Sequence, residues 1–150
     1  MAKILQVNYR FPKPFEDIPK EQMNKLMEMS VEVAKHLTTV PGLRWKIYLQ
    51  NPEKGEVGGI YLFEDEASLK AYLDGPLMTQ RKQGKFGDGK RVVSPIVDVT
   101  IKQFDVMEEL TKITRGPVAG AVEATVISIG KRTRHSRVHL PSHERHGVKL

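Results

Sequence analysis

The sequence predicts one α+β domain followed by a basic extension. At 150 residues the chain is long enough for one hydrophobic core and too short for two ordinary domains. Its apolar spacing changes repeatedly between the period of a strand and that of a helix before residue 106. Of the net charge of +6, residues 131–150 carry +5, from six Lys or Arg and one Glu. The basic character therefore belongs to the end of the chain.

The first strand and the first helix are predicted from residues 3–37. Residues 3–11 alternate between apolar and polar side chains, and Pro12 and Pro14 lack the backbone donor needed to continue a sheet. Asp17 is the predicted N-cap of a helix from about Pro19 to His36. The expected buried face of this helix consists of Met23, Leu26, Met27, Val33, Ala34 and Leu37.

A β-hairpin is predicted next, with strands at 43–50 and 57–63 and a turn at 51–55. In an unbroken first strand, Leu43, Trp45, Ile47 and Leu49 would share one face, and Arg44, Lys46, Tyr48 and Gln50 the other. The second strand contains Gly58-Gly59, which indicates either a β-bulge or the close approach of another group.

A second helix and a long last strand complete the predicted domain. Asp65 caps the helix, which ends before Gly75-Pro76, and a short helical piece can follow at 77–85. Residues 84–90 resemble a mobile glycine-rich turn, and 91–106 a fourth strand in which Pro95 marks an edge, a bend or a start. A final short helix is expected at 108–115.

The order β-α-β-β-α-β defines a ferredoxin-like unit, whose sheet has a single layer of helices. Both faces of strand 57–63 are apolar: Ile60 and Leu62 point one way, and Tyr61 and Phe63 the other. An apolar face without helices must be buried, at about 25 cal/mol per Å² of apolar area, and a second copy is the simplest cover. The sequence therefore predicts a homodimer.

Several segments resemble the YdhR-like proteins, a family described as monooxygenases within the dimeric α+β barrel superfamily. The most specific run extends from residues 41–47 (PGLRWKI) to residues 56–63 (EVGGIYLF), and segments 65–73 and 104–113 continue the likeness. The resemblance covers roughly residues 3–115 and implies a dimeric barrel with a pocket between sheet and helices in each subunit. We therefore expect a barrel domain at 1–115 and an extension at 116–150, in which 118–129 could add a strand to a sheet edge.

The resemblance also implies the leading function, a cofactor-independent monooxygenase that acts on a small aromatic or quinone-like compound with molecular oxygen. No cofactor fingerprint or paired-histidine metal motif occurs in residues 1–115, so no cofactor and no metal are expected. Two alternatives stay open: a non-catalytic dimeric binding module for a small hydrophobic ligand, and an isomerase, cyclase or lyase on the same scaffold.

The candidate site residues are chosen by side-chain type, because aromatic rings stack on a flat substrate and amide, indole and phenol groups donate hydrogen bonds. Each of these residues has an alternative role: it could pack in the core or in the dimer contact, or it could simply be exposed to solvent. The catalytic candidates are Asn8, Trp45 and Tyr61, and the substrate-binding candidates are Arg10, Arg44, Tyr48 and Tyr72.

Composition excludes several other kinds of site and partner. The chain has no cysteine, which excludes disulfides, thiol catalysis and thiolate metal sites. No stretch approaches the length of a membrane span, and residues 1–7 lack the features of a signal peptide, so we expect a cytoplasmic protein without a membrane partner. The four histidines of the tail (His135, His139, His143 and His146) are interpreted as part of a solvated basic arm, and no nucleic-acid partner is expected.

Overall fold

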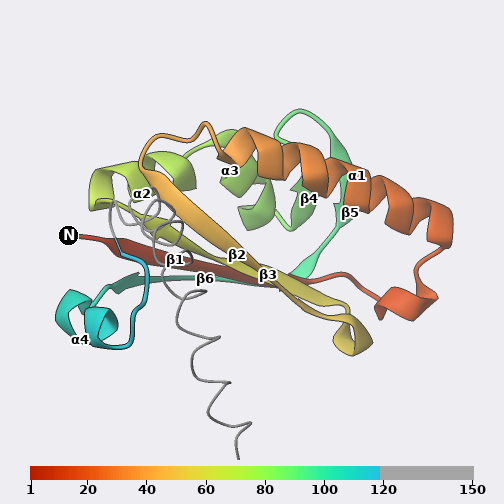
Figure 1. Cartoon of the computed structure of the whole chain (residues 1–150). Helices are drawn as coiled ribbons and strands as arrows, with labels where there is room; N and C mark the ends of the chain where they lie inside the picture. The colour runs from red at the N-terminus through yellow and green to blue at the C-terminus, as the bar shows by residue number, and fades with distance from the viewer. Residues whose placement is uncertain (119–150) are drawn as a thin grey trace, which may run out of the picture.

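The computed structural model describes residues 1–118, which form one sheet with helices on its two sides, and a small second sheet (Figure 1). The predicted strand at 118–129 and the basic tail thus lie outside the described residues, apart from Val118. In chain order the elements are β1 (Lys3–Arg10), η1 (Phe15–Asp17), α1 (Lys20–Leu37), β2 (Leu43–Asn51), η2 (Pro52–Lys54), β3 (Glu56–Phe63), α2 (Glu66–Leu73), α3 (Pro76–Lys82), β4 (Lys85–Gly87), β5 (Val92–Pro95), β6 (Val97–Asp105) and α4 (Glu108–Ile113).

The main sheet has the strand order β2-β3-β1-β6, and every neighbouring pair is antiparallel. This is the ferredoxin-like arrangement, so the predicted fold class is confirmed. Helices α1, α2 and α3 lie on one side of the sheet, and the short helix α4 lies on the other (Figure 1). We call these the helix face and the open face. No helix within residues 1–118 is long and apolar enough to cross a membrane.

The hydrophobic core lies between the helix face and the helices. Leu5 and Val7 of β1 pair with Tyr61 and Gly59 of β3, so their side chains share the helix face. Leu5, Val7, Tyr61 and Phe63 are all at most 5% exposed. α2 and α3 contribute Leu69 and further buried residues to the same core. The alternation of strand 3–11 therefore predicted the correct inward-facing side chains.

Helix α1 has the predicted extent, but it lacks the predicted Asp17 cap and buries a partly different set of residues. Asp17 belongs to the short 3-10 helix η1, and Pro19 precedes the first turn of α1 without a side-chain cap. Leu26, Val33 and Leu37 are buried as expected, but Met29 joins them while Met27 is 60% exposed. The sequence predicts burial of Met27 because three- and four-residue spacings fit both methionines, and only the packing direction distinguishes them.

Strand β2 contains a β-bulge that changes the predicted faces. Leu43 pairs with Phe63, whereas Trp45 pairs with Leu62, and the register shifts between them. Leu43 therefore packs against the core of the helix face, while Trp45 and Ile47 lie on the open face. The prediction that Leu43, Trp45 and Ile47 share one face was wrong, because one extra residue reverses the alternation.

The predicted long fourth strand is two strands in different sheets. β5 pairs with β4 in a separate two-stranded sheet, and β6 pairs with β1 at the edge of the main sheet. Between them Ile96 is 4% exposed, and its backbone N–H donates to the carbonyl of Gly84. The turn predicted at 84–90 therefore contains an ordered strand. The short helices predicted near 77–85 and 108–115 are confirmed as α3 and α4.

The Gly58-Gly59 pair allows two close approaches, one on each face of the sheet. β3 keeps a regular register with both neighbours across these residues, so the predicted bulge is absent here. A Cβ on Gly58 would clash with Oδ1 of Asn8, and a Cβ on Gly59 would lie 2.5 Å from Cε of Lys46. The alternative prediction, close approach of another group, is therefore correct.

Candidate functional site

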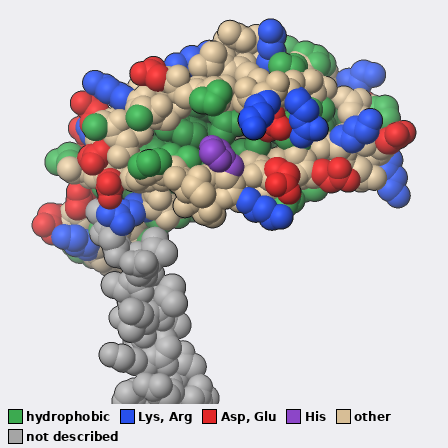
Figure 2. Space-filling model, turned by 90° about the horizontal axis from the view of Figure 1, so that it is seen from above, with side chains coloured by type: hydrophobic (Ala, Val, Ile, Leu, Met, Phe, Trp, Pro, Cys, Tyr) green, Lys and Arg blue, Asp and Glu red, His purple; other side chains and the backbone are tan. Residues whose placement is uncertain are grey.

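A cavity of about 400 Å³ lies between the helix face and helices α1 and α3. This is within the size range of pockets for small molecules. Seen from the helix side, hydrophobic side chains gather in a hollow in the middle of the molecule (Figure 2). The aromatic residues of the cavity wall are Tyr9, Phe11, Phe15, Tyr48, Tyr61, Tyr72 and Phe86. A cavity with such walls suits a flat apolar ring.

The cavity has a buried floor and an exposed rim. On the floor, Val7 and Tyr61 are at most 5% exposed, and Leu26 of α1 is 4% exposed. At the rim, Met27 of α1 is 60% exposed and Tyr48 of β2 is 51% exposed. The cavity therefore opens between α1 and the edge strand β2.

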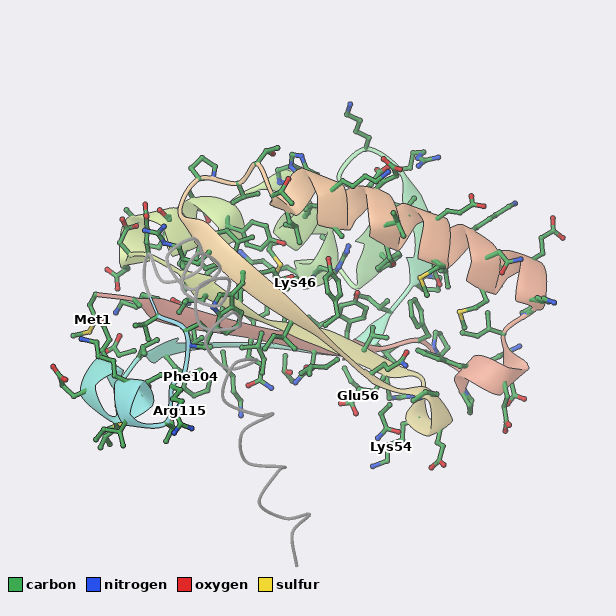
Figure 3. The ribbon with its side chains drawn as sticks, viewed as in Figure 1. Met1, Lys46, Lys54, Glu56, Phe104 and Arg115 are labelled. Atoms are coloured by element: carbon green, nitrogen blue, oxygen red, sulfur yellow. The ribbon has the colours of Figure 1, made fainter. Side chains whose placement is uncertain are left out.

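Lys46 of β2 reaches from the edge of the sheet across the floor of the cavity. It pairs with Tyr61 in the antiparallel register, so its side chain lies on the helix face (Figure 3). Its Nζ is 3.8 Å from the ring centroid of Tyr48 and 4.5 Å from that of Tyr61. The aliphatic part of the side chain occupies the space left by the missing Cβ of Gly59. The glycine and the two rings thus fix the position of the amine.

Burial, together with the nearby Arg81 guanidinium, lowers the pKa of the Lys46 amine from 10.5 to about 7. Burial raises the pKa of the four tyrosine hydroxyls at the cavity, those of Tyr9, Tyr48, Tyr61 and Tyr72. At neutral pH these phenols are therefore uncharged and can donate hydrogen bonds. Lys46, by contrast, can accept or release a proton close to neutral pH.

Arg81 of α3 supplies a second cation at the inner end of the cavity and, unlike the half-buried Lys46, it is fully buried. The residue is 7% exposed, and its Nη1 donates a hydrogen bond of 3.0 Å to the carbonyl of Gly87. The guanidinium lies 4.5 Å from the ring centroid of Phe86 and 5.5 Å from that of Tyr9. These contacts hold Arg81 in place through backbone and aromatic groups, and no carboxylate of residues 1–118 forms an ion pair with it.

The structure brings three of the predicted site residues into this cavity. Tyr48, Tyr61 and Tyr72 line it, and the hydroxyl of Tyr72 donates to that of Tyr61 over a long 3.4 Å. The distance makes this a weak hydrogen bond. Both buried hydroxyls can therefore turn toward a bound polar group at little cost.

The other four predicted residues do not line this cavity. Asn8 and Trp45 lie on the open face, where Asn8 covers Gly58 and Nε1 of Trp45 donates to the carbonyl of Pro117 at 3.3 Å. Arg10 and Arg44 form ion pairs with Asp98 at 2.8 Å and Glu64 at 2.7 Å. As cavity residues these four are not supported by the geometry.

Sequence reasoning missed Lys46 and Arg81. Lys46 alternates with apolar residues on β2 and was therefore interpreted as part of a polar face, and Arg81 lies in a short helix with little periodicity. One signal was present: Lys46 shares its face with Tyr48 and, across the hairpin, Gly59, which leaves room for a long side chain. In residues 1–118, no group of three or more His, Cys, Asp or Glu side chains is placed to bind a metal ion.

These features define a class, the small ferredoxin-like proteins with a ligand-sized cavity between sheet and helices. The family model described as "Putative mono-oxygenase ydhR" matches residues 4–117, and the chain belongs to this family. No curated protein matches the sequence.

Among solved structures, the chain is similar to a protein from Deinococcus radiodurans entitled "putative antibiotic biosynthesis monooxygenase", with a TM-score of 0.49 and 14% identity over 71% of this chain and 92% of that one. It is also similar to SnoaB, a cofactor-independent oxygenase from Streptomyces nogalater, with a TM-score of 0.46 and 8% identity over 71% and 93% of the two chains. The heme degrader MhuD from Mycobacterium tuberculosis matches with a TM-score of 0.45 and 14% identity over 69% and 95%.

Proposed function

We propose that the protein is a cofactor-independent monooxygenase that oxidises a small aromatic or quinone-like compound with molecular oxygen in this cavity. Membership of the ydhR family supports the reaction class. The observation that carries the substrate class is the aromatic wall of a cavity of about 400 Å³, together with the buried phenol hydroxyls of Tyr61 and Tyr72. The rings hold a flat substrate, and the hydroxyls of Tyr61 and Tyr72 donate to its oxygen atoms.

An anthrone-type substrate satisfies the chemistry without an added reductant. Its activated CH₂ group and O₂ give a carbonyl group and one water molecule: both C–H bonds break, one oxygen atom becomes the carbonyl oxygen, and the other leaves as water with the two hydrogens. All electrons come from the substrate, so the protein needs to bind the ring, stabilise negative charge on oxygen and exclude water.

The open face supports a homodimer. Ile47 of β2 and Phe104 of β6 are 52% and 46% exposed there, and Val97 is 37% exposed. Figure 3 shows Phe104 on the side of the sheet opposite Lys46. A second copy placed against this face would bury these side chains and close the two sheets into a barrel.

Oxygen uptake with a panel of anthrones and hydroquinones, measured with metal ions chelated, tests the function. Ser30 of α1 lines the cavity, whereas its neighbour Val31 is 45% exposed. We expect uptake with at least one compound, loss of uptake in Ser30→Trp, which fills the cavity, and retention in Val31→Trp. Circular dichroism checks that both variants fold. Binding of the compounds without any uptake would support a non-catalytic binding module instead.

A further inference from the structure

The charges at the cavity are unbalanced. Lys46 and Arg81 both line it, and none of its other lining residues within residues 1–118 is an Asp or Glu. Neither cation forms an ion pair in that part of the chain. The titratable groups that face them are the phenols of Tyr9, Tyr48, Tyr61 and Tyr72, and α1 contributes only apolar residues and Ser30 to the wall. The described cavity thus carries positive charge without a negative partner.

Such an arrangement is costly unless something compensates it. A buried cation without a counter-charge loses hydration, and two cations in one cavity also repel each other. In the free protein Lys46 reduces the cost by releasing its proton, in keeping with the direction of its pKa. An anion bound in the cavity that both side chains line would offset the cost and restore the charge of the amine.

We propose that Lys46 and Arg81 form an anion subsite that binds the ring compound through an ionised oxygen, as a phenolate, enolate or carboxylate. The inference rests on the proposed function, since it specifies the substrate class of the same cavity. For a phenol or enol, the O–H bond breaks, the neutral Lys46 amine takes the proton, and the resulting ammonium stays beside the anionic oxygen. Arg81 supplies a charge that does not depend on pH near neutrality.

The position of Lys46 fits a proton acceptor for a stacked ring. Its Nζ lies within 4.5 Å of the ring centroids of Tyr48 and Tyr61, so a substrate ring in the aromatic part of the cavity has its edge near the amine. A phenol made anionic in this way is a stronger electron donor to oxygen. Lys46 thereby fills the role of the internal base that the sequence did not reveal.

Calorimetry with two redox-inert probes tests the subsite independently of oxidation. The probes are 2-naphthoate, which is always anionic near neutral pH, and its neutral counterpart 2-naphthamide. We expect the full-length protein to bind 2-naphthoate at least about tenfold more tightly than 2-naphthamide, because a buried charge pair exceeds about 1.4 kcal/mol. At pH 8, where free Lys46 is mostly neutral, binding of 2-naphthoate should take up close to one proton, seen as a dependence of the binding heat on the buffer.

Lys46→Met should abolish the proton uptake and reduce the preference for 2-naphthoate below about threefold. Lys35→Met is the matched control, since the Lys35 side chain is 70% exposed, and it should leave both unchanged. Arg81→Lys keeps a cation and should retain part of the preference. Equal affinity for both probes, or proton uptake that persists in Lys46→Met, would overturn the proposal. If the probes gave such a result but oxygen uptake were still observed, the anion subsite would be rejected and the monooxygenase proposal retained. If the probes bound as expected but no compound gave oxygen uptake, the monooxygenase proposal would be rejected and the anion subsite retained.

Discussion

The two faces of the sheet arise from the same alternation of residues, but their apolar side chains differ in exposure to solvent. On β3, Tyr61 and Phe63 point toward the helices and are at most 5% exposed. On the open face, Ile47 of β2 is 52% exposed and Phe104 of β6 is 46% exposed. The helix face is completed within the chain and encloses a cavity, whereas the open face leaves apolar area in contact with water. In the proposed function, ligand chemistry belongs to the first face and association to the second.

The largest difference between the faces is expected in folding stability. Leu5→Ala on the helix face removes a fully buried side chain, and we expect a loss of about 2–5 kcal/mol in the free energy of unfolding. Ile47→Ala on the open face should cost less than about 1 kcal/mol when the protein is dilute, and more as concentration rises. Urea unfolding at two protein concentrations measures both. A penalty for Ile47→Ala that does not change with concentration would argue against association through this face.

A charge on the open face should separate the subunits. Ile47→Asp places a carboxylate in the proposed contact, and we expect the dissociation constant of the dimer to rise by about 100-fold or more, since burying an unpaired charge is costly. Val31→Asp on α1 makes the same change at an exposed apolar residue on the other side of the molecule. Sedimentation equilibrium should find the control unchanged. Equal dimerisation of both variants would show that the open face is not the contact.

Gly58 and Gly59 of β3 allow the two faces to be compared by the same substitution at neighbouring residues. A Cβ on Gly58 would lie 2.5 Å from the backbone oxygen of Val7, whereas a Cβ on Gly59 would meet the end of the flexible Lys46 side chain. We expect Gly58→Ala to lower the free energy of unfolding by about 1–3 kcal/mol and Gly59→Ala by less than about 1 kcal/mol. Gly59→Ala should still weaken 2-naphthoate binding, because it displaces the amine. The reverse order of stabilities would contradict the assigned register.

The last difference concerns the pH dependence of stability that comes from Lys46. The pKa of its amine is about 7 in the folded protein, against an ordinary value of 10.5 in an unfolded chain, so between these values the unfolded chain binds more protons. Stability from this group therefore rises with pH from 7 upward, by about 1 kcal/mol per pH unit. Urea unfolding at pH 7 and pH 9 should show this rise in the wild type relative to Lys46→Met. If the free energy of unfolding changed with pH in the same way in the wild type and in Lys46→Met, the Lys46 amine would be exposed to water in the folded protein.

The sequence predicts the fold better than the site. Alternation in residues 3–11 and 57–63 identified the strands and their faces, because each residue of a regular strand reverses direction. The bulge between Leu43 and Trp45 was missed, because it depends on the pairing with a separate strand. Pro95 did indicate an irregularity in the fourth strand, but its division between two sheets depends on contacts with distant segments. Of the site candidates, Tyr48 and Tyr61 reach the cavity by their parity on β2 and β3, and Tyr72 reaches it from the buried face of α2. Lys46 was missed because only the partner strand shows that its face is enclosed.

The most direct test of the division between the faces is a crystal structure of the protein with 2-naphthoate bound. We expect the ring among the aromatic side chains of the helix-face cavity and the carboxylate within hydrogen-bonding distance of Lys46 and Arg81. A ligand bound on the open face beside Trp45, or a carboxylate turned toward solvent at the rim, would contradict the account.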